Sequence, residues 1–304
     1  MNIELLDTYK KQAKNIIKTG IIIGIILSIF LIGLTIITNN LFLIFFEIFI
    51  IIIVSIITFF VYSIPFKKYK TVYKKVYVEK ALQSVFTDLV YKPDSGFDES
   101  IIRNTEMMDM GDRYESNDYF SGKYKNINVE QADVEIEEER ERKGSDGKTE
   151  TYYVTLFRGK WMMFDFNKPF RANMQVKDKS FSNSKISNWG KEVKFKKVKL
   201  EDEDFNKRFK VYAQDEEEAF YILTPQFMDK IKKLSANVLG DLLFCFIDNK
   251  LHIGLNNNND SFEPKLFSNP SEEEIKNSIL SDINEITNFV DQLNLDNDLF
   301  KREA

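Results

Sequence analysis

Two long apolar stretches close to the N-terminus constrain this chain of 304 residues more than any other feature. Residues 21–37 carry no charge, and 13 of these 17 residues are Ile, Leu or Phe. Residues 41–64 contain Glu47 as their single charge. As a helix this second stretch reaches about 36 Å, more than the roughly 30 Å of a bilayer's hydrocarbon core. The sequence therefore predicts two transmembrane helices.

The residues between and beside these stretches predict how the two helices run. Thr38, Asn39 and Asn40 are too few for anything but a tight turn, so we expect an antiparallel hairpin with both flanks on one side. Residues 19–66 contain no Lys or Arg, whereas nine lysines lie before and after them, up to position 75. Since cytosolic segments beside transmembrane helices are enriched in Lys and Arg, we expect both termini in the cytosol.

Small and acidic residues within the hairpin have two interpretations each. Gly20, Gly24 and Ser28 recur every four residues, a spacing that lets another helix approach closely in a membrane. We expect the second helix of the hairpin to be that partner; the alternative is self-association into a homo-oligomer. Glu47 is either a functional intramembrane acid or, as we favour, a residue at the outer interface just before a span that begins at Ile48.

Charge divides the chain into a basic head and an acidic body. Up to Lys75 there are nine lysines and three acids, a local charge of +6, so the formal −5 of the whole chain leaves −11 for the remainder. Because phosphate binding needs Lys and Arg that displace counterions, this acidic body argues against nucleic acid as a partner. Cys245 is the only cysteine, which excludes an intrachain disulfide and a Cys-rich zinc site.

Periodicity predicts four parts. Apolar residues at helical spacing indicate a cytosolic amphipathic helix over residues 1–18 and a juxtamembrane helix over residues 67–92, on either side of the transmembrane hairpin at 19–66. After a turn signal at 92–96, the chain becomes rich in β-branched and aromatic residues. Strands are expected at 119–127, 129–136, 151–157, 161–166, 193–200, 242–247 and 251–255, with turns at 144–147, 158–159 and 248–249. Consecutive strands joined by short turns predict an antiparallel sheet with flanking helices, hence a cytosolic α+β domain over residues 93–304.

Two helix starts are marked by capping residues. Thr224 suits the N-cap position and Pro225 the first helical position of a helix whose apolar stripe begins at Met228. Ser271 and Glu274 have the spacing of a capping box at the start of the last helix.

Over most of its length the chain resembles a bacterial membrane-protein family, "domain of unknown function 3137". The resemblance lies in residues 156–159 and in a run that comprises Phe209, Val211, Tyr212, Asp215, Glu218, Ala219, Tyr221, Leu223, Thr224 and Pro225, followed by Phe227 and Met228. The paired apolar segments are similar too. The resemblance implies a bacterial plasma (inner) membrane protein with a cytosolic α+β domain, and a LemA-type membrane protein as a guessed partner. It implies no activity and no catalytic residues.

The side chains that most often carry chemistry are scarce. His252 is the only histidine and lies within an expected strand, where a structural or exposed role is favoured; Cys245, between two phenylalanines, is interpreted as a core residue. The sequence has no phosphate-binding loop, dinucleotide fingerprint or nucleophile elbow. Acidic clusters at 137–139, 201–204 and 215–218 lack calcium-loop spacing and are interpreted as solvated charge. We therefore predict no catalytic residue, cofactor or metal.

These observations favour a membrane-anchored cytosolic protein-interaction module or scaffold, with lipid and a membrane protein as partners, rather than an enzyme. One alternative is a membrane-surface enzyme acting on lipid or envelope precursors through carboxylates, which would need convergent acids in a pocket. Another is a small oligomeric channel or transport accessory. The ligand, the partner and the physiological process are not predicted by the sequence.

Overall fold

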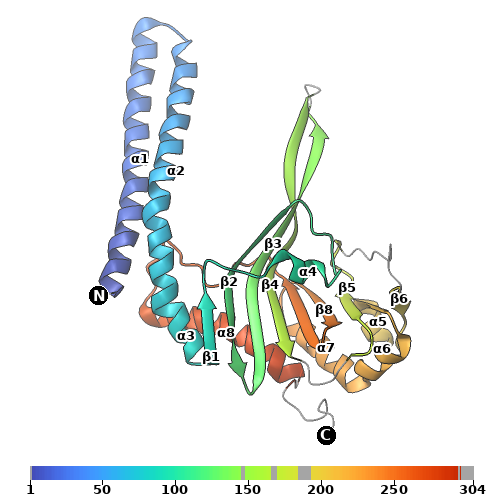
Figure 1. Ribbon diagram of the computed structural model, residues 1–304. Coiled ribbons are helices and arrows are strands. Elements are labelled where there is room, and N and C mark those ends of the chain that lie inside the picture. The colour runs from blue at the N-terminus through green and yellow to red at the C-terminus, as the bar shows by residue number, and fades with distance from the viewer. Residues whose placement is uncertain (1, 145–147, 166–169, 184–192, 294, 296–304) are drawn as a thin grey trace. The chain divides into compact units, whose positions relative to one another are not determined.

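The computed structural model describes residues 2–144, 148–165, 170–183, 193–293 and 295. The chain divides into two compact units, one formed by Met1–Lys80 with Glu263–Asn277 and the other by Ala81–Phe262 with Ser278–Ala304. Two long apolar helices precede an antiparallel sheet with flanking helices (Figure 1), which confirms the predicted α+β class.

The first unit contains the helical hairpin. Helices α1 (Asn2–Thr38) and α2 (Leu43–Tyr73) run antiparallel, side by side (Figure 1). They are joined by a short turn in which Asn39 has φ of 50° and Asn40 Oδ1 accepts a hydrogen bond from the Phe42 N–H at 3.0 Å. By length and composition both helices can cross a membrane. Most of their Ile and Phe side chains are exposed, as lipid-facing residues would be.

The chain after the second helix departs from the predicted continuous helix. A π-helical turn (Lys74–Val78) and the short helix α3 (Glu79–Gln83) follow α2, and then β1 (Thr87–Lys92) begins. The prediction of helix through residue 92 was therefore wrong over β1. Leu89, which fits an apolar helical stripe, instead belongs to the edge strand of the sheet.

The second unit is built on one open sheet, which has nine strands in the part of the chain that the structure describes (Figure 1). The order is β1-β2-β3-β4-β9-β8-β5-β7-β6, and all neighbours are antiparallel. The remaining strands are β2 (Arg113–Tyr124), β3 (Ile127–Lys143), β4 (Thr149–Asp165), β5 (Met174–Asp178), β6 (Lys196–Val198), β7 (Phe209–Ala213), β8 (Asp241–Ile247) and β9 (Lys250–Asn256).

One predicted turn is absent because a glycine serves another purpose. The expected turn at 158–159 lies inside β4, which runs unbroken from Thr149 to Asp165. Gly159 has φ of +153°, and a Cβ there would lie 2.1 Å from the Leu255 carbonyl oxygen. The glycine therefore allows β9 to approach β4 closely, which strand periodicity alone does not reveal. By contrast, the β8–β9 turn is as predicted, with Asp248 and Asn249 both at positive φ.

Two helices begin at the predicted caps. Thr224 Oγ1 accepts from the Phe227 N–H at the start of α7 (Pro225–Asn237). Ser271 and Glu274 exchange the two hydrogen bonds of a capping box before α8 (Glu272–Leu293). Three shorter helices are α4 (Glu99–Arg103), α5 (Glu203–Arg208) and α6 (Glu216–Ile222).

The two faces of the sheet differ in the side chains that they carry. Ala132, Val134 and Trp161 point to one face, where they pack with Ile102 of α4 and with Met107 in an apolar core. The strand alternation places Asp133 of β3 and its cross-strand partner Lys160 of β4 on the opposite face. This opposite face meets α8, because Lys160 forms an ion pair with Glu285.

Candidate functional site

Three aspartates from separate parts of the second unit converge on the α8 face of the sheet. Asp133 lies in β3, Asp118 lies at a bulge in the neighbouring strand β2, and Asp260 lies in the loop after β9. Each offers a carboxylate oxygen, and these oxygens lie within 4.8 Å of one another. We call this group the aspartate cluster.

The bulge explains how Asp118 reaches the cluster. The pairing of β2 with β3 shifts between Asn117 and Phe120, and Asp118 has φ of 55°. A bulge adds a residue and redirects its side chain. Asp118 is fully buried, and its Oδ1 accepts a hydrogen bond of 2.6 Å from the Tyr91 hydroxyl.

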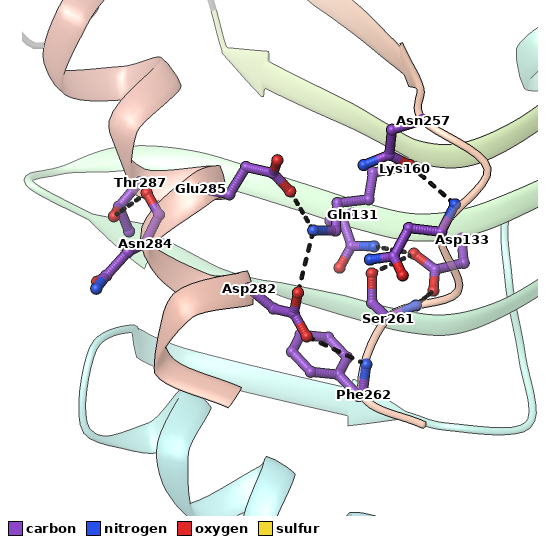
Figure 2. A network of polar contacts seen from close by, with 11 residues as sticks. Gln131, Asp133, Lys160, Asn257, Ser261, Phe262, Asp282, Asn284, Glu285 and Thr287 are labelled. Carbon is purple, nitrogen blue, oxygen red and sulfur yellow. Dashed lines mark hydrogen bonds and ion pairs between the residues drawn. The ribbon is translucent and has the colours of Figure 1, made fainter. Parts of the chain in front are cut away.

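Asp133 is the centre of a hydrogen-bond network (Figure 2). Its Oδ1 accepts from Gln131 Nε2 at 3.0 Å and from Ser261 Oγ at 2.9 Å, and its Oδ2 accepts from the Ser261 N–H. These donors favour the carboxylate. Burial, followed by the charges of Asp118 and Asp260, favours the neutral acid and raises the pKa of Asp133 well above its usual value. A cation arriving at the cluster would relieve this repulsion.

The nearest buried cation is already engaged. The side chain of Lys160 is fully buried, and its Nζ pairs with Glu285 and, at 3.5 Å, with Asp282 of α8 (Figure 2). Burial opposes its charge, but Glu285 and Asp282 outweigh that effect and raise the pKa of Lys160. Lys160 therefore compensates the two acids of α8 first and the aspartate cluster only in part.

An open cleft of about 450 Å³ adjoins the cluster. Four acidic residues line its wall: Glu115, Asp133, Glu135 and Asp260. The one positively charged residue among the described lining residues is Arg158, whose guanidinium lies 3.5 Å from the Glu135 carboxylate. The cleft is therefore acidic. Its lining residues are Tyr114, Glu115, Ser116, Asn117, Asp133, Val134, Glu135, Arg158, Asn259 and Asp260.

Chemically, the arrangement suits a positively charged ligand. Carboxylate and amide oxygens are the ligands that Ca²⁺ and Mg²⁺ take in proteins, and Asp118, Asp133, Asp260 and Asn259 offer them here. The same oxygens, at the wall of an open cleft, also suit the ammonium or guanidinium group of a basic side chain.

The small residues of the hairpin have unequal surroundings. Gly20, Gly24 and Ser28 border an apolar groove between α1 and α2. A Cβ at Gly20 would lie 2.3 Å from Thr58 Oγ1 on α2, whereas one at Gly24 would meet nothing within 4 Å. Glu47 lies in the second turn of α2.

The residues that carry the family resemblance belong to helices and strands of the fold, and none of them lines the acidic cleft. These residues lie in β7, in α6 and at the start of α7: Phe209, Val211, Tyr212, Asp215, Glu218, Ala219, Tyr221, Leu223, Thr224 and Pro225. Asp215 caps α6 by accepting from the Glu217 N–H at 3.0 Å. Glu218 is buried, and its Oε1 accepts from the Arg171 N–H at 3.3 Å.

His252 and Cys245 lie in the interior, away from solvent. Nδ1 of His252 accepts from the Trp161 indole N–H at 3.3 Å, and burial, with Lys250 nearby, lowers the pKa of the imidazole to about 4. Burial raises the pKa of the Cys245 thiol to about 12. Near neutral pH the thiol therefore stays protonated, which is not the nucleophilic form, and the imidazole stays neutral with its Nδ1 occupied by the Trp161 N–H.

The acidic runs singled out in the sequence have local partners. Glu138 pairs with Arg140 and Glu139 accepts from the Tyr153 hydroxyl, both on the β3–β4 ribbon. Asp202 caps α5 and pairs with Lys232 at 2.6 Å. The aspartate cluster draws on none of these runs. Its members are single acids within otherwise unremarkable segments, and the one sequence signal was the turn-like Asn117-Asp118 pair just before the strand expected at 119–127.

Comparisons with known proteins agree with the resemblance over the second half of the chain. The model of the family described as "Protein of unknown function (DUF3137)" matches residues 155–295, which confirms the predicted resemblance over that segment. The crystal structure of the mycobacterial trehalose monomycolate transport factor A, TtfA, is similar with a TM-score of 0.38 and 8% identity, over 71% of this chain and 92% of that chain. Curated proteins gave no match.

Proposed function

We propose that this chain, whose residues 155–295 match the family "Protein of unknown function (DUF3137)", is a protein-interaction module anchored in a bacterial inner membrane. Both termini and the sheet unit lie in the cytosol, and a membrane protein, with a LemA-type protein as the first one to test, is the partner. Two helices with apolar segments, and the nine lysines that lie before and after residues 19–66, support this topology.

The acidic cleft carries the proposal. Four acids reach its wall or floor with one arginine among them, and a fifth, Asp118, lies behind it. A partner segment that inserts a Lys or Arg side chain would neutralise Asp260 and Asp133 and would displace water from a cleft of about 450 Å³. Desolvated charge pairs of this kind contribute most at the centre of an interface.

The test is capture of the full-length protein, with its bound partners, from its native membrane. The cleft variant combines Glu115→Gln with Asp260→Asn, and the control combines Glu216→Gln with Glu217→Gln on α6, which removes the same charge elsewhere. We expect the cleft variant to recover at least about fivefold less of a membrane protein that the wild type and the control retain, equivalent to about 1 kcal/mol. Equal recovery with all three proteins would overturn the role of the cleft.

The convergence of three carboxylates favours one second candidate, a membrane-surface enzyme that acts on lipid or envelope precursors with a divalent cation. Its test is titration of the full-length protein with Mg²⁺ or Ca²⁺ alone. The enzyme requires an increase in melting temperature that Asp118→Asn abolishes, together with turnover of a lipid substrate that the same substitution abolishes. The interaction module requires neither.

A further inference from the structure

A two-stranded arm extends from the sheet at β3 and β4 (Figure 1). The pairing of β3 with β2 ends at Glu137, and the pairing of β4 with β9 ends at Gly159. Beyond these positions β3 and β4 pair only with each other, from Glu138 opposite Val154 to Lys143 opposite Thr149. We call residues 138–143 and 149–155 the arm. A two-stranded ribbon is marginally stable in water, and a third strand stabilises it.

The two edges of the arm differ in charge. All six residues from 138 to 143 on the β3 edge are charged. Among residues 149–155 on the β4 edge, Glu150 is the only charged one, and the rest are Thr, Tyr and Val. Charged residues are the usual protection of a strand edge against pairing, while Thr, Tyr and Val favour strands. The β3 edge is therefore protected and the β4 edge is open.

The hydrogen bonding across the ribbon fixes which backbone groups of the β4 edge point outward. The Gly144 N–H donates to the Lys148 carbonyl at 2.7 Å. Gly144 and Lys148 are therefore a hydrogen-bonded pair, and hydrogen-bonded and non-hydrogen-bonded pairs alternate along an antiparallel ladder. Every second residue of β4 consequently turns its N–H and C=O groups away from β3, namely Thr149, Thr151, Tyr153 and Thr155. The next carbonyl, that of Leu156, accepts from Asn183 Nδ2 at 2.6 Å. Within the ranges that the structure describes, no backbone group pairs with the outward groups of residues 149–155.

We propose that the β4 edge is the contact between two copies of this chain, which join their arms into one four-stranded antiparallel sheet. The pairing is centred on Tyr152, so that Tyr152 lies opposite Tyr152, Thr151 opposite Tyr153, and Glu150 opposite Val154. Thr151 and Tyr153 then exchange their outward hydrogen bonds across the two-fold axis. The assembly closes after two copies, because the same patch is used on both.

The charges of the arm favour pairing with a second copy through the β4 edge rather than through the β3 edge. In the β4 pairing no charge lies opposite a like charge. In the β3 pairings that the ladder allows, Glu139 would lie opposite Glu141, or Arg140 opposite Arg142, which is destabilising. After two β4 edges join, both outer edges of the new sheet are charged β3 edges, so no open edge is left on the arms.

The test uses single cysteines in the full-length protein. Tyr152 is 40% exposed, so Tyr152→Cys places a thiol at the surface. The natural Cys245 is buried and should react little under the same conditions. Residues opposite each other in a non-hydrogen-bonded pair have Cβ atoms close enough for a disulfide. In bilayers under mild oxidation we expect Tyr152→Cys to form a disulfide-linked dimer. Glu141→Cys on the β3 edge, the matched control, should stay monomeric.

A second pair of variants removes one outward N–H from each edge. Thr151→Pro in the Tyr152→Cys background should lower the yield of crosslinked dimer at least about tenfold, because proline cannot donate to the new ladder. Glu141→Pro in the same background should leave the yield unchanged, and tryptophan fluorescence checks that both variants fold. Equal crosslinking through Glu141→Cys, a Tyr152→Cys protein that stays monomeric, or dimers unaffected by Thr151→Pro would overturn the proposal.

Discussion

His252 is a buried side chain whose protonation makes the stability of the fold depend on pH. Its Nδ1 accepts the Trp161 N–H, so the imidazole must be unprotonated at that nitrogen. Burial lowers its pKa to about 4 in the folded chain, against 6.5 for the free side chain. Between these values the unfolded chain binds a proton that the folded chain does not. The group is therefore neutral for stability above about pH 6.5 and destabilises the fold as the pH falls toward 4.

We predict that His252→Gln removes this pH dependence, because a glutamine amide can still accept from Trp161 but does not titrate. The wild type should lose roughly 3 kcal/mol more than the variant between pH 6.5 and 4, since each pKa unit corresponds to about 1.4 kcal/mol. Urea unfolding of the full-length protein in detergent, followed by tryptophan emission at a series of pH values, measures the difference. Parallel pH profiles for the two proteins would contradict the assignment.

Single residues also mark where sequence reasoning reached its limit. The interior place of Cys245 follows from its two phenylalanine neighbours, but the meeting of Asp118, Asp133 and Asp260 depends on a bulge and on a loop that returns across the sheet. Strand alternation does not give the position of a bulge, and no local pattern pairs residue 118 with residue 260. The aspartate cluster was therefore missed.

At the scale of elements, local signals predicted most starts and turns. Thr224 and Ser271 cap their helices as expected, and Asp248-Asn249 makes the β8–β9 turn, because these signals depend on neighbours in the chain. The predicted helix over β1 and the predicted turn at Gly159 failed for the opposite reason. Pairing with β2 makes residues 87–92 a strand, and the approach of β9 requires the glycine.

The helical hairpin of α1 and α2 offers a matched pair of glycines. We predict that Gly20→Val destabilises the packing of α1 on α2 by about 1–3 kcal/mol, because a Cβ there would overlap Thr58. Gly24→Val adds the same side chain to the same helix where nothing lies within 4 Å, and it should be close to neutral. The melting temperatures of both variants in detergent micelles measure the effect. Equal losses would show that helix propensity, and not the approach of α2, sets the cost.

At the scale of the whole molecule, the chain combines a basic, apolar first unit with an acidic sheet unit. The apolar runs and the lysines at their ends made this division predictable, since hydrophobic length and charge are properties of composition. The order of the nine described strands could not be predicted from the sequence. It depends on pairings between strands that are distant in the chain, β4 with β9 and β5 with β7 and β8.

The central claim is that two helices cross the bilayer together and leave the sheet unit in the cytosol. The most direct test is labelling of single-cysteine variants in intact cells with a membrane-impermeant thiol reagent, with the buried Cys245 as a silent background. We predict that Asn40→Cys, in the turn between α1 and α2, is labelled from outside, whereas Lys196→Cys in β6 is labelled only after the membrane is permeabilised. Labelling of Lys196→Cys in intact cells, with Asn40→Cys protected, would contradict the account.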